Sequence, residues 1–266
     1  MSTIAYIVLW LALAVAALDR RYAARWSRRV AAGMIGCAWG MWAILLVRRA
    51  LDAGHWPLST RYEFALCWVW STLAIYFLLE ADRQRAIGWA TVVAALLIAT
   101  YALTRPASER AMTPLPPILR SVWLQLHVLT TVMGYAVLGV AAAAALAALS
   151  VGRQSSPEEH QATEIVERTM ERMVALGLPW LTAAILTGAI WAEHAWGRYW
   201  GWDPKETWSL VTWLWYLLIL HIAPLPRWRG RPLAWLVLAG YGLILFTFMG
   251  VPWLVRTVRL ESLHGF

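Results

Sequence analysis

Eight long apolar stretches, separated by short polar connections, constrain the fold of this chain more than any other feature. A helix needs about 17 to 25 mostly apolar residues to cross a membrane, and each stretch is close to that length. The stretches cover residues 3–18, 30–47, 63–80, 86–104, 123–149, 173–192, 208–225 and 233–254. Only 14% of the residues are charged, which argues against a soluble enzyme, since soluble domains carry about 25%. The sequence therefore predicts an all-α, polytopic membrane bundle of about eight transmembrane helices, forming one domain over residues 1–266.

The positive charges of the connections predict how these helices are oriented. The larger set, in the connections after alternate stretches, is Arg20, Arg21, Arg25, Arg28, Arg29, Arg83, Arg85, Arg153, Arg168, Arg172, Arg227, Arg229 and Arg231. The smaller set is Arg48, Arg49, Arg61, Arg105, Arg110, Arg120, Arg198, Lys205, Arg256 and Arg259. Because the richer side of a membrane protein faces the cytoplasm, we expect the larger set inside and both termini outside. The net charge of +8 then reflects orientation in the membrane and not nucleic-acid binding.

Two connections contain the residue pattern that starts a helix. Residues 156–159 read Ser-Pro-Glu-Glu, which predicts a separate amphipathic helix over 157–171 on the inner side. Residues 203–206 read Asp-Pro-Lys-Glu and predict the start of the seventh membrane helix. The carboxylates of Asp203 and Glu206 would also suit acid–base catalysis, but a capping box explains the pair more simply.

Residues 191–215, which we call the tryptophan segment, are the densest feature of the chain. They hold seven of its 20 tryptophans, and we expect them to form an outer loop. Gly197 and Gly201 let a backbone approach a ligand closely, and Arg198 and Lys205 can pair with carboxylates. A porphyrin, which is a flat apolar ring with two propionates, fits these requirements. An aromatic belt at the membrane interface is the alternative, but a belt explains two or three such indoles better than seven.

Imidazole is the usual axial ligand of haem iron, so the six histidines are candidate ligands. His127 and His264 are predicted at the outer surface. His221 lies 13 residues beyond Trp208, about 20 Å further along a helix, and a histidine inside a span predicts a function. His194 is a weaker candidate among the tryptophans, and His55 and His160 are expected to be ordinary surface residues. No predicted span holds two histidines, which disfavours a b-type cytochrome with paired haems.

Four stretches together resemble one protein family. WGRYWGWDPKETW, followed by WLWYLLILH, resembles the WWD signature of haem-handling proteins in cytochrome c assembly. HWPLSTRYEF and LRSVWLQLHVLTTVMGY narrow the resemblance to the CcsA/ResC type, and ESLHGF resembles the terminal GLHSY-type stretch of that type. The resemblance covers roughly residues 50–266.

The resemblance implies a set of ligands and partners. His127 and His264 match the two outer histidines that ligate haem above the WWD loop, and His221 matches the membrane histidine. Within the WWD loop, the tryptophans expected to contact the haem are Trp196, Trp200, Trp202 and Trp208. The family implies haem b as cargo, and membrane lipid, apocytochrome c and a CcsB/ResB-type membrane protein as partners. It also implies a bacterial cytoplasmic membrane in preference to a thylakoid, with the tryptophan segment and the C-terminus outside.

The implied function is to move haem across the membrane and present it to the CxxCH thiols of apocytochrome c. The chain would be a subunit of a holocytochrome c synthetase, and it contains no nucleophile motif of its own. Two other functions stay open from the sequence: a haem-binding assembly or regulatory protein without ligation activity, and a polytopic transporter.

Overall fold

The computed structural model describes residues 2–22, 25–79, 81–111, 116–150 and 157–258, and no strand occurs within these ranges. The α-helices are α1 (Ser2–Tyr22), α2 (Arg25–Ala53), α3 (Arg61–Phe77), α4 (Ala81–Leu103), α5 (Ala107–Arg110), α6 (Val122–Ser150), α7 (Pro157–Trp196), α8 (Pro204–Ile222), α9 (Arg231–Leu245) and α10 (Val251–Val258). Two 3₁₀ turns, η1 (Pro117–Arg120) and η2 (Pro226–Trp228), and a π-helical turn, η3 (Phe246–Gly250), complete the described elements. The predicted all-helical bundle is confirmed.

Each predicted membrane stretch coincides with a helix. Five helical segments are long and apolar enough to cross a membrane: Arg29–Ala53, Ala86–Leu103, Val122–Ser150, His160–Trp196 and Arg231–Val258. The apolar segment Thr3–Ala17 is shorter. α3 and α8 contain 17 and 19 residues and are rich in tryptophan and tyrosine, whose polar atoms lower their hydropathy. The chain is therefore a multi-pass membrane protein.

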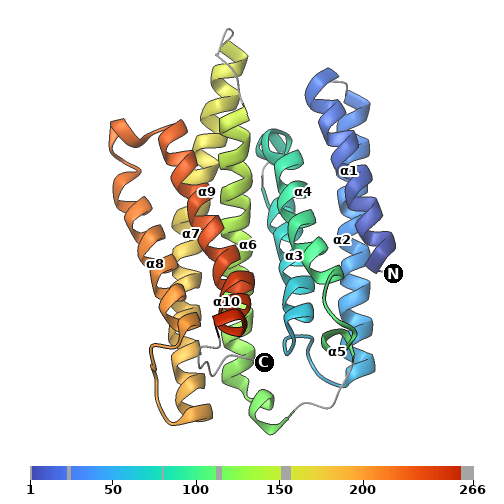
Figure 1. Cartoon of the computed structure of the whole chain (residues 1–266). Coiled ribbons are helices and arrows are strands. Elements are labelled where there is room, and N and C mark those ends of the chain that lie inside the picture. Colours follow the sequence, from blue (N-terminus) through green and yellow to red (C-terminus); the bar gives the residue numbers. More distant parts are fainter. Residues whose placement is uncertain (1, 23–24, 80, 112–115, 151–156, 259–266) are drawn as a thin grey trace.

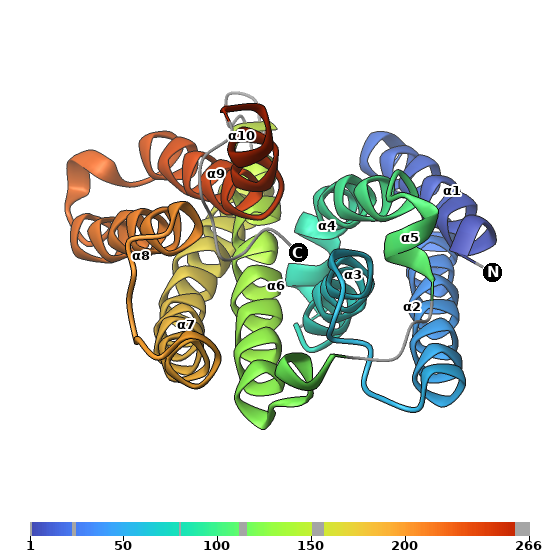
Figure 2. The ribbon, with the colours of Figure 1, turned by 60° about the horizontal axis from the view of Figure 1, so that its bottom comes forward.

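α6 lies at the centre of the bundle and joins its two halves (Figure 2). It packs against α3 and α4 on one side and against α7 and α9 on the other. Its run of alanines from 141 to 145 is buried all round, as expected for a helix without a polar face. Gly177 of α7 receives the Leu138 side chain of α6, and a Cβ at Gly177 would lie 2.5 Å from Leu138 Cδ2. Small residues thus let α6 and α7 approach closely.

α7 corrects one expectation from the sequence. The amphipathic helix predicted over 157–171 is not separate from the sixth span, because α7 runs through 40 residues without a break. No glycine or proline interrupts the chain between residues 158 and 176, so nothing ends the first helix. Pro179 lies inside α7, and the proposed cap at Ser156 lies outside the described residues.

The helix ends separate into two groups at opposite ends of the bundle (Figure 1). We call the end that holds α5, the start of α6 and the α7–α8 connection the tryptophan end. The other, the far end, holds the end of α8, the start of α9 and the start of α7. Apart from Arg153 and Arg259, which lie outside the described residues, the larger arginine set lies toward the far end and the smaller set toward the tryptophan end. This division agrees with the predicted path of the chain.

Candidate functional site at the tryptophan end

The tryptophan segment is mostly helical, and this differs from the long loop expected. Only residues 197–203 lie between α7 and α8. α7 ends at Gly197, which has a φ of 72° and donates its N–H to the Glu193 carbonyl at 2.8 Å. This is the left-handed stop that glycine favours. The sequence did not reveal that most tryptophans of the segment belong to the end of α7 and the start of α8.

The start of α8 is fixed by the predicted capping box, which is confirmed. The Asp203 carboxylate accepts from Lys205 N at 2.9 Å, and Glu206 accepts from the N–H groups of Asp203 and Gly201 at 3.2 and 2.8 Å. Both carboxylates therefore hold backbone amides of the connection, as capping residues do. This geometry supports the capping role over acid–base catalysis.

The tryptophans of the segment divide into packed and exposed groups. Trp213 Nε1 donates to Thr182 Oγ1 at 2.8 Å, and Trp215 Nε1 donates to the Leu236 carbonyl at 2.9 Å. Trp208 packs edge-on against Phe246, with ring centroids 4.6 Å apart. These indoles bind helices together, so the segment's tryptophan count overstates the surface available to a ligand.

The exposed aromatic side chains of the connection are Trp202 and Tyr199, which lie on either side of the partly exposed Trp200. Trp202 is 69% exposed and has a φ of 57°, a left-handed conformation that is costly for a bulky residue and typical of functional sites. Its ring meets Trp200 edge-on at 5.7 Å. Trp196, at the end of α7, packs edge-on against Trp191 at 4.9 Å. Gly201 leaves room for Arg198, since a Cβ there would lie 2.8 Å from the Arg198 Cζ.

His127 lies in the first turns of α6, half-buried against α7. Its Nδ1 bonds to the Ala184 carbonyl at 2.8 Å. Because a carbonyl only accepts, Nδ1 carries the proton and Nε2 carries the ring's lone pair. Gly188 makes space for the ring, since a Cβ there would lie 2.7 Å from Nδ1. The carbonyl contact fixes the tautomer and orientation of the ring, as second contacts do for histidines that ligate metals.

The other sequence-predicted ligands are placed differently. His264 lies outside the described residues. His221 is the penultimate residue of α8 rather than a mid-span residue, because the helix ends at Ile222, before Pro224 and Pro226. Its Nδ1 bonds to the Leu217 carbonyl at 2.7 Å, and its side chain is exposed on the outside of the bundle. His194 is exposed at the end of α7, with Nδ1 bonded to the Ile190 carbonyl at 2.8 Å. The structure therefore separates His221 from His127 by the length of the bundle.

Positive charges from several elements converge at the tryptophan end, and we call Arg61, Arg105, Lys205 and Arg256 the cationic group. The charges of its three arginines all act on the Tyr101 hydroxyl. Burial lowers the pKa of Lys205, the Arg61 charge lowers it further, and Asp203 raises it in part. Arg61 pairs with Glu109 at 2.7 Å. The sequence pointed only to Lys205, because the others come from distant elements.

Two polar atoms within this region are buried without a hydrogen-bond partner among the described residues. They are Nε of Arg105, whose guanidinium lies 4.0 Å from the centre of the Tyr101 ring, and Oε2 of Glu109. Glu109 and Asp203 offset part of the positive charge of the cationic group. The remaining like charges, held together at a partly buried site, cost free energy that a further anion would lower. The region is thus suited to an anionic group.

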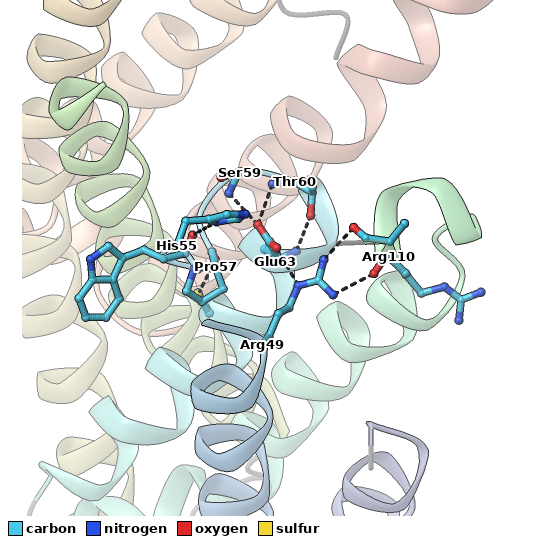
Figure 3. A network of polar contacts seen from close by, with 10 residues as sticks. Arg49, His55, Pro57, Ser59, Thr60, Glu63 and Arg110 are labelled. Carbon is cyan, nitrogen blue, oxygen red and sulfur yellow. Dashed lines mark hydrogen bonds and ion pairs between the residues drawn. The ribbon is translucent and has the colours of Figure 1, made fainter. Parts of the chain in front are cut away.

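A buried ion pair holds the neighbouring helix ends in place (Figure 3). Arg49 Nε donates to Glu63 Oε1 at 2.7 Å, and Arg49 also donates to the Arg110 and Ala111 carbonyls at 2.9 and 3.3 Å. Glu63 Oε2 accepts from Ser59 N and Thr60 N at 2.8 and 3.2 Å. The network links the end of α2, the start of α3 and α5. Within the stretch HWPLSTRYEF it uses the backbone amides of Ser59 and Thr60 and the carboxylate of Glu63.

We expect Glu63→Gln to destabilise the protein strongly. Arg49 and Glu63 are only 8% and 1% exposed, and removing one charge of a buried pair costs about 3–5 kcal/mol. The melting temperature in detergent should fall clearly below that of the wild type. Glu109→Gln is the matched control, since its pair with Arg61 is less buried and should contribute less. Equal melting temperatures for Glu63→Gln and the wild type would show that this pair does not secure the helix ends.

With this geometry in place, a family model described as cytochrome c assembly protein matches residues 58–259. The chain belongs to this family. The match begins beside the Arg49–Glu63 network and includes His127, the tryptophan segment and His221, but it ends before His264. The match therefore includes His127, His194 and His221 but not His55.

Individual relatives extend the match over most of the chain. Proteins named cytochrome c biogenesis protein CcsA are 33% identical in Synechococcus sp. (strain JA-3-3Ab), covering 84% of this chain and 82% of the relative. The CcsA protein of Thermosynechococcus vestitus is also 33% identical, covering 85% of this chain and 86% of the relative. These relatives bear out the resemblance to the CcsA type.

A solved structure shares the fold. The structure of the cytochrome c haem lyase CcmF aligns with a TM-score of 0.66 and 18% identity. The alignment covers 98% of this chain and 51% of that one, so the chain spans about half the length of that protein. The arrangement of helices described here is therefore one that another protein of this type also adopts.

Proposed function

We propose that this membrane protein binds haem b at its tryptophan end and presents it to apocytochrome c for covalent attachment. The observation that carries the proposal is the orientation of His127, which holds its Nδ1 proton on the Ala184 carbonyl and its Nε2 lone pair on the opposite side of the ring. His264 is the proposed second axial ligand. Two imidazoles on one iron would make the haem low-spin.

The remaining parts of the site suit the rest of the haem molecule. Trp196, Trp200 and Trp202 supply aromatic surface for the ring, and a large aromatic side chain buries about 150–250 Å² when it is enclosed. The cationic group and Arg198 supply charge for the two propionates, because guanidinium groups bind carboxylates through paired hydrogen bonds. A macrocycle with two carboxylates at one edge needs both kinds of surface close together.

In the attachment reaction the protein needs only to orient the haem relative to the cysteine thiols. Each cysteine thiol of a CxxCH segment adds across a haem vinyl group, forming one carbon–sulfur bond while the thiol proton passes to the other vinyl carbon. No group leaves, and the apocytochrome supplies the nucleophiles. Holding the vinyl groups near the thiols is therefore the contribution we assign to this chain.

We place haem at His221 before it reaches the tryptophan end. The exposed position of this side chain on α8 means that a second iron ligand at that depth must come from another molecule. We propose a histidine of a CcsB/ResB-type partner that packs beside α8. In this scheme the far end faces the cytoplasm of a bacterial cell and the tryptophan end faces the outside, which agrees with the arginine distribution.

Reconstitution tests the proposal. The chain is expressed with a CcsB-type partner and an apocytochrome carrying CxxCH, in a strain without its own assembly proteins. We expect covalent haem on the cytochrome, detected on a denaturing gel, only when both membrane proteins are present. Haem on the purified membrane proteins without covalent cytochrome would instead favour an assembly or regulatory role, and absence of haem from both would favour a transporter.

A further inference from the structure

A cavity of about 460 Å³ lies at the far end, between α7, α8 and α9. Its volume falls within the range of about 300–1,000 Å³ that is usual for small-molecule sites. Its walls come from residues 168–175 of α7, residues 219–224 at the end of α8, and residues 229–237 at the start of α9. The cavity is thus built at the level where these helices meet the edge of the membrane.

The cavity is amphipathic. Its polar part holds three arginines, Arg168, Arg172 and Arg229, against one carboxylate, Glu171, which leaves an excess of positive charge. Its innermost apolar residues, which include Met170, Val174 and Ile219, are buried. The apolar surface open to an occupant comes from Ala175, Leu220 and Pro224 at the rim. An occupant must therefore combine an anionic head with an apolar body.

The arginines are not neutralised equally by the protein. Arg168 pairs with Glu164 in the preceding turn of α7. No carboxylate lies within ion-pair distance of Arg172 or Arg229 among the described residues, although the Arg229 charge acts on Glu167. Arg168 and Arg172 also stand four residues apart on one helix, a spacing at which like charges repel. An external anion would relieve this repulsion.

This cavity is separate from the proposed haem position at His221. Ile219 of α8 is buried in the cavity wall, whereas His221 is exposed. Successive residues of an α-helix are about 100° apart, so two positions turn the side chain by about 200°, to the opposite face. The His221 ring therefore points away from the cavity, and the two features serve different ligands.

We propose that this cavity binds an anionic phospholipid, with its phosphate on Arg172 and Arg229 and its acyl chains against the apolar rim formed by Ala175, Leu220 and Pro224. Basic pockets between membrane helices bind the headgroups of anionic lipids in this way. The lipid comes from the leaflet at the far end and links α7, α8 and α9 near the end that carries His221. This site does not depend on haem binding at either histidine position.

The test uses the purified full-length chain and native mass spectrometry with phosphatidylglycerol and phosphatidylcholine. The wild type should bind phosphatidylglycerol more tightly than phosphatidylcholine. The double variant Arg172→Gln/Arg229→Gln should weaken phosphatidylglycerol binding about 30-fold, because each arginine near an anionic headgroup contributes a factor of about five. Binding of phosphatidylcholine should stay the same.

Arg227→Gln is the matched control. Arg227 is exposed at the same end, beside the Trp228 ring, and lies outside the cavity wall, so its removal should not change lipid selectivity. If the double variant expresses poorly, the single Arg229→Gln variant gives the same test with about a fivefold loss. Equal phosphatidylglycerol affinity in wild type and variant would overturn the proposal. Loss of haem with unchanged lipid binding would overturn it too, by assigning the cavity to haem carboxylates.

Discussion

His127→Ala should remove most of the low-spin haem spectrum from the tryptophan end. The Ala184 carbonyl and the space at Gly188 orient the imidazole, and the alanine side chain offers the iron no ligand in its place. We expect at least a tenfold loss of haem retained through purification, since disturbing even the outer contacts of a metal ligand costs 10–100-fold in affinity. Added imidazole should restore part of the spectrum by filling the vacant axial position.

Two further variants make this result specific. His194→Ala is the control, because His194 is an exposed histidine at the same end and its loss should leave the spectrum intact. Gly188→Ala keeps the ligand but places a Cβ 2.7 Å from the His127 Nδ1, so it should weaken the same signal by displacing the ring. An unchanged spectrum in His127→Ala would refute the axial role of this histidine.

His221→Ala should lower haem at both ends of the protein. Its side chain points outward from the last turn of α8, so we expect the partner-dependent haem to disappear from the purified complex. In the proposed route haem reaches the tryptophan end by way of this position, so haem there and the yield of cytochrome c should fall as well, by tenfold or more. The measurement is the absorbance of the complex together with covalent haem on the cytochrome.

The matched control for this variant is His160→Ala. His160 is exposed near the start of α7 at the same end of the bundle, and its loss should change neither haem content nor cytochrome yield. If His221→Ala keeps wild-type haem at the tryptophan end and a normal cytochrome yield, haem does not travel by way of His221. The proposal for transport would then be wrong, while the proposal for the His127 site would stand.

The fold was largely predictable because neighbouring residues determine the position and length of most of its helices. Apolar length marked the membrane helices, and the Asp203 capping box marked the start of α8 to within a residue. The continuity of α7 was missed because the charged residues near its start look like a surface helix, although nothing in that stretch ends a helix. The sequence was therefore sufficient to predict features that depend on neighbouring residues, such as the apolar length of a helix and its cap.

The site was only partly predictable because its decisive contacts join residues far apart in the chain. His127 could be named from its surroundings, but its contact with Ala184 lies 57 residues away. Arg49 and Glu63 carry no signal of pairing, and the cationic group assembles from α3, α8, α10 and the turn that follows α4. Among the tryptophans, composition could not separate Trp213 and Trp215, which bind helices together, from the exposed Trp202.

An absorbance spectrum of the protein purified together with a CcsB-type partner tests whether this chain binds haem through histidine imidazoles. Haem should copurify, and the reduced spectrum should show the sharp visible bands of low-spin, bis-imidazole iron. A folded complex that carries no haem when haem supply is ample, or that holds only high-spin haem unaffected by His127→Ala and His221→Ala, would contradict this account.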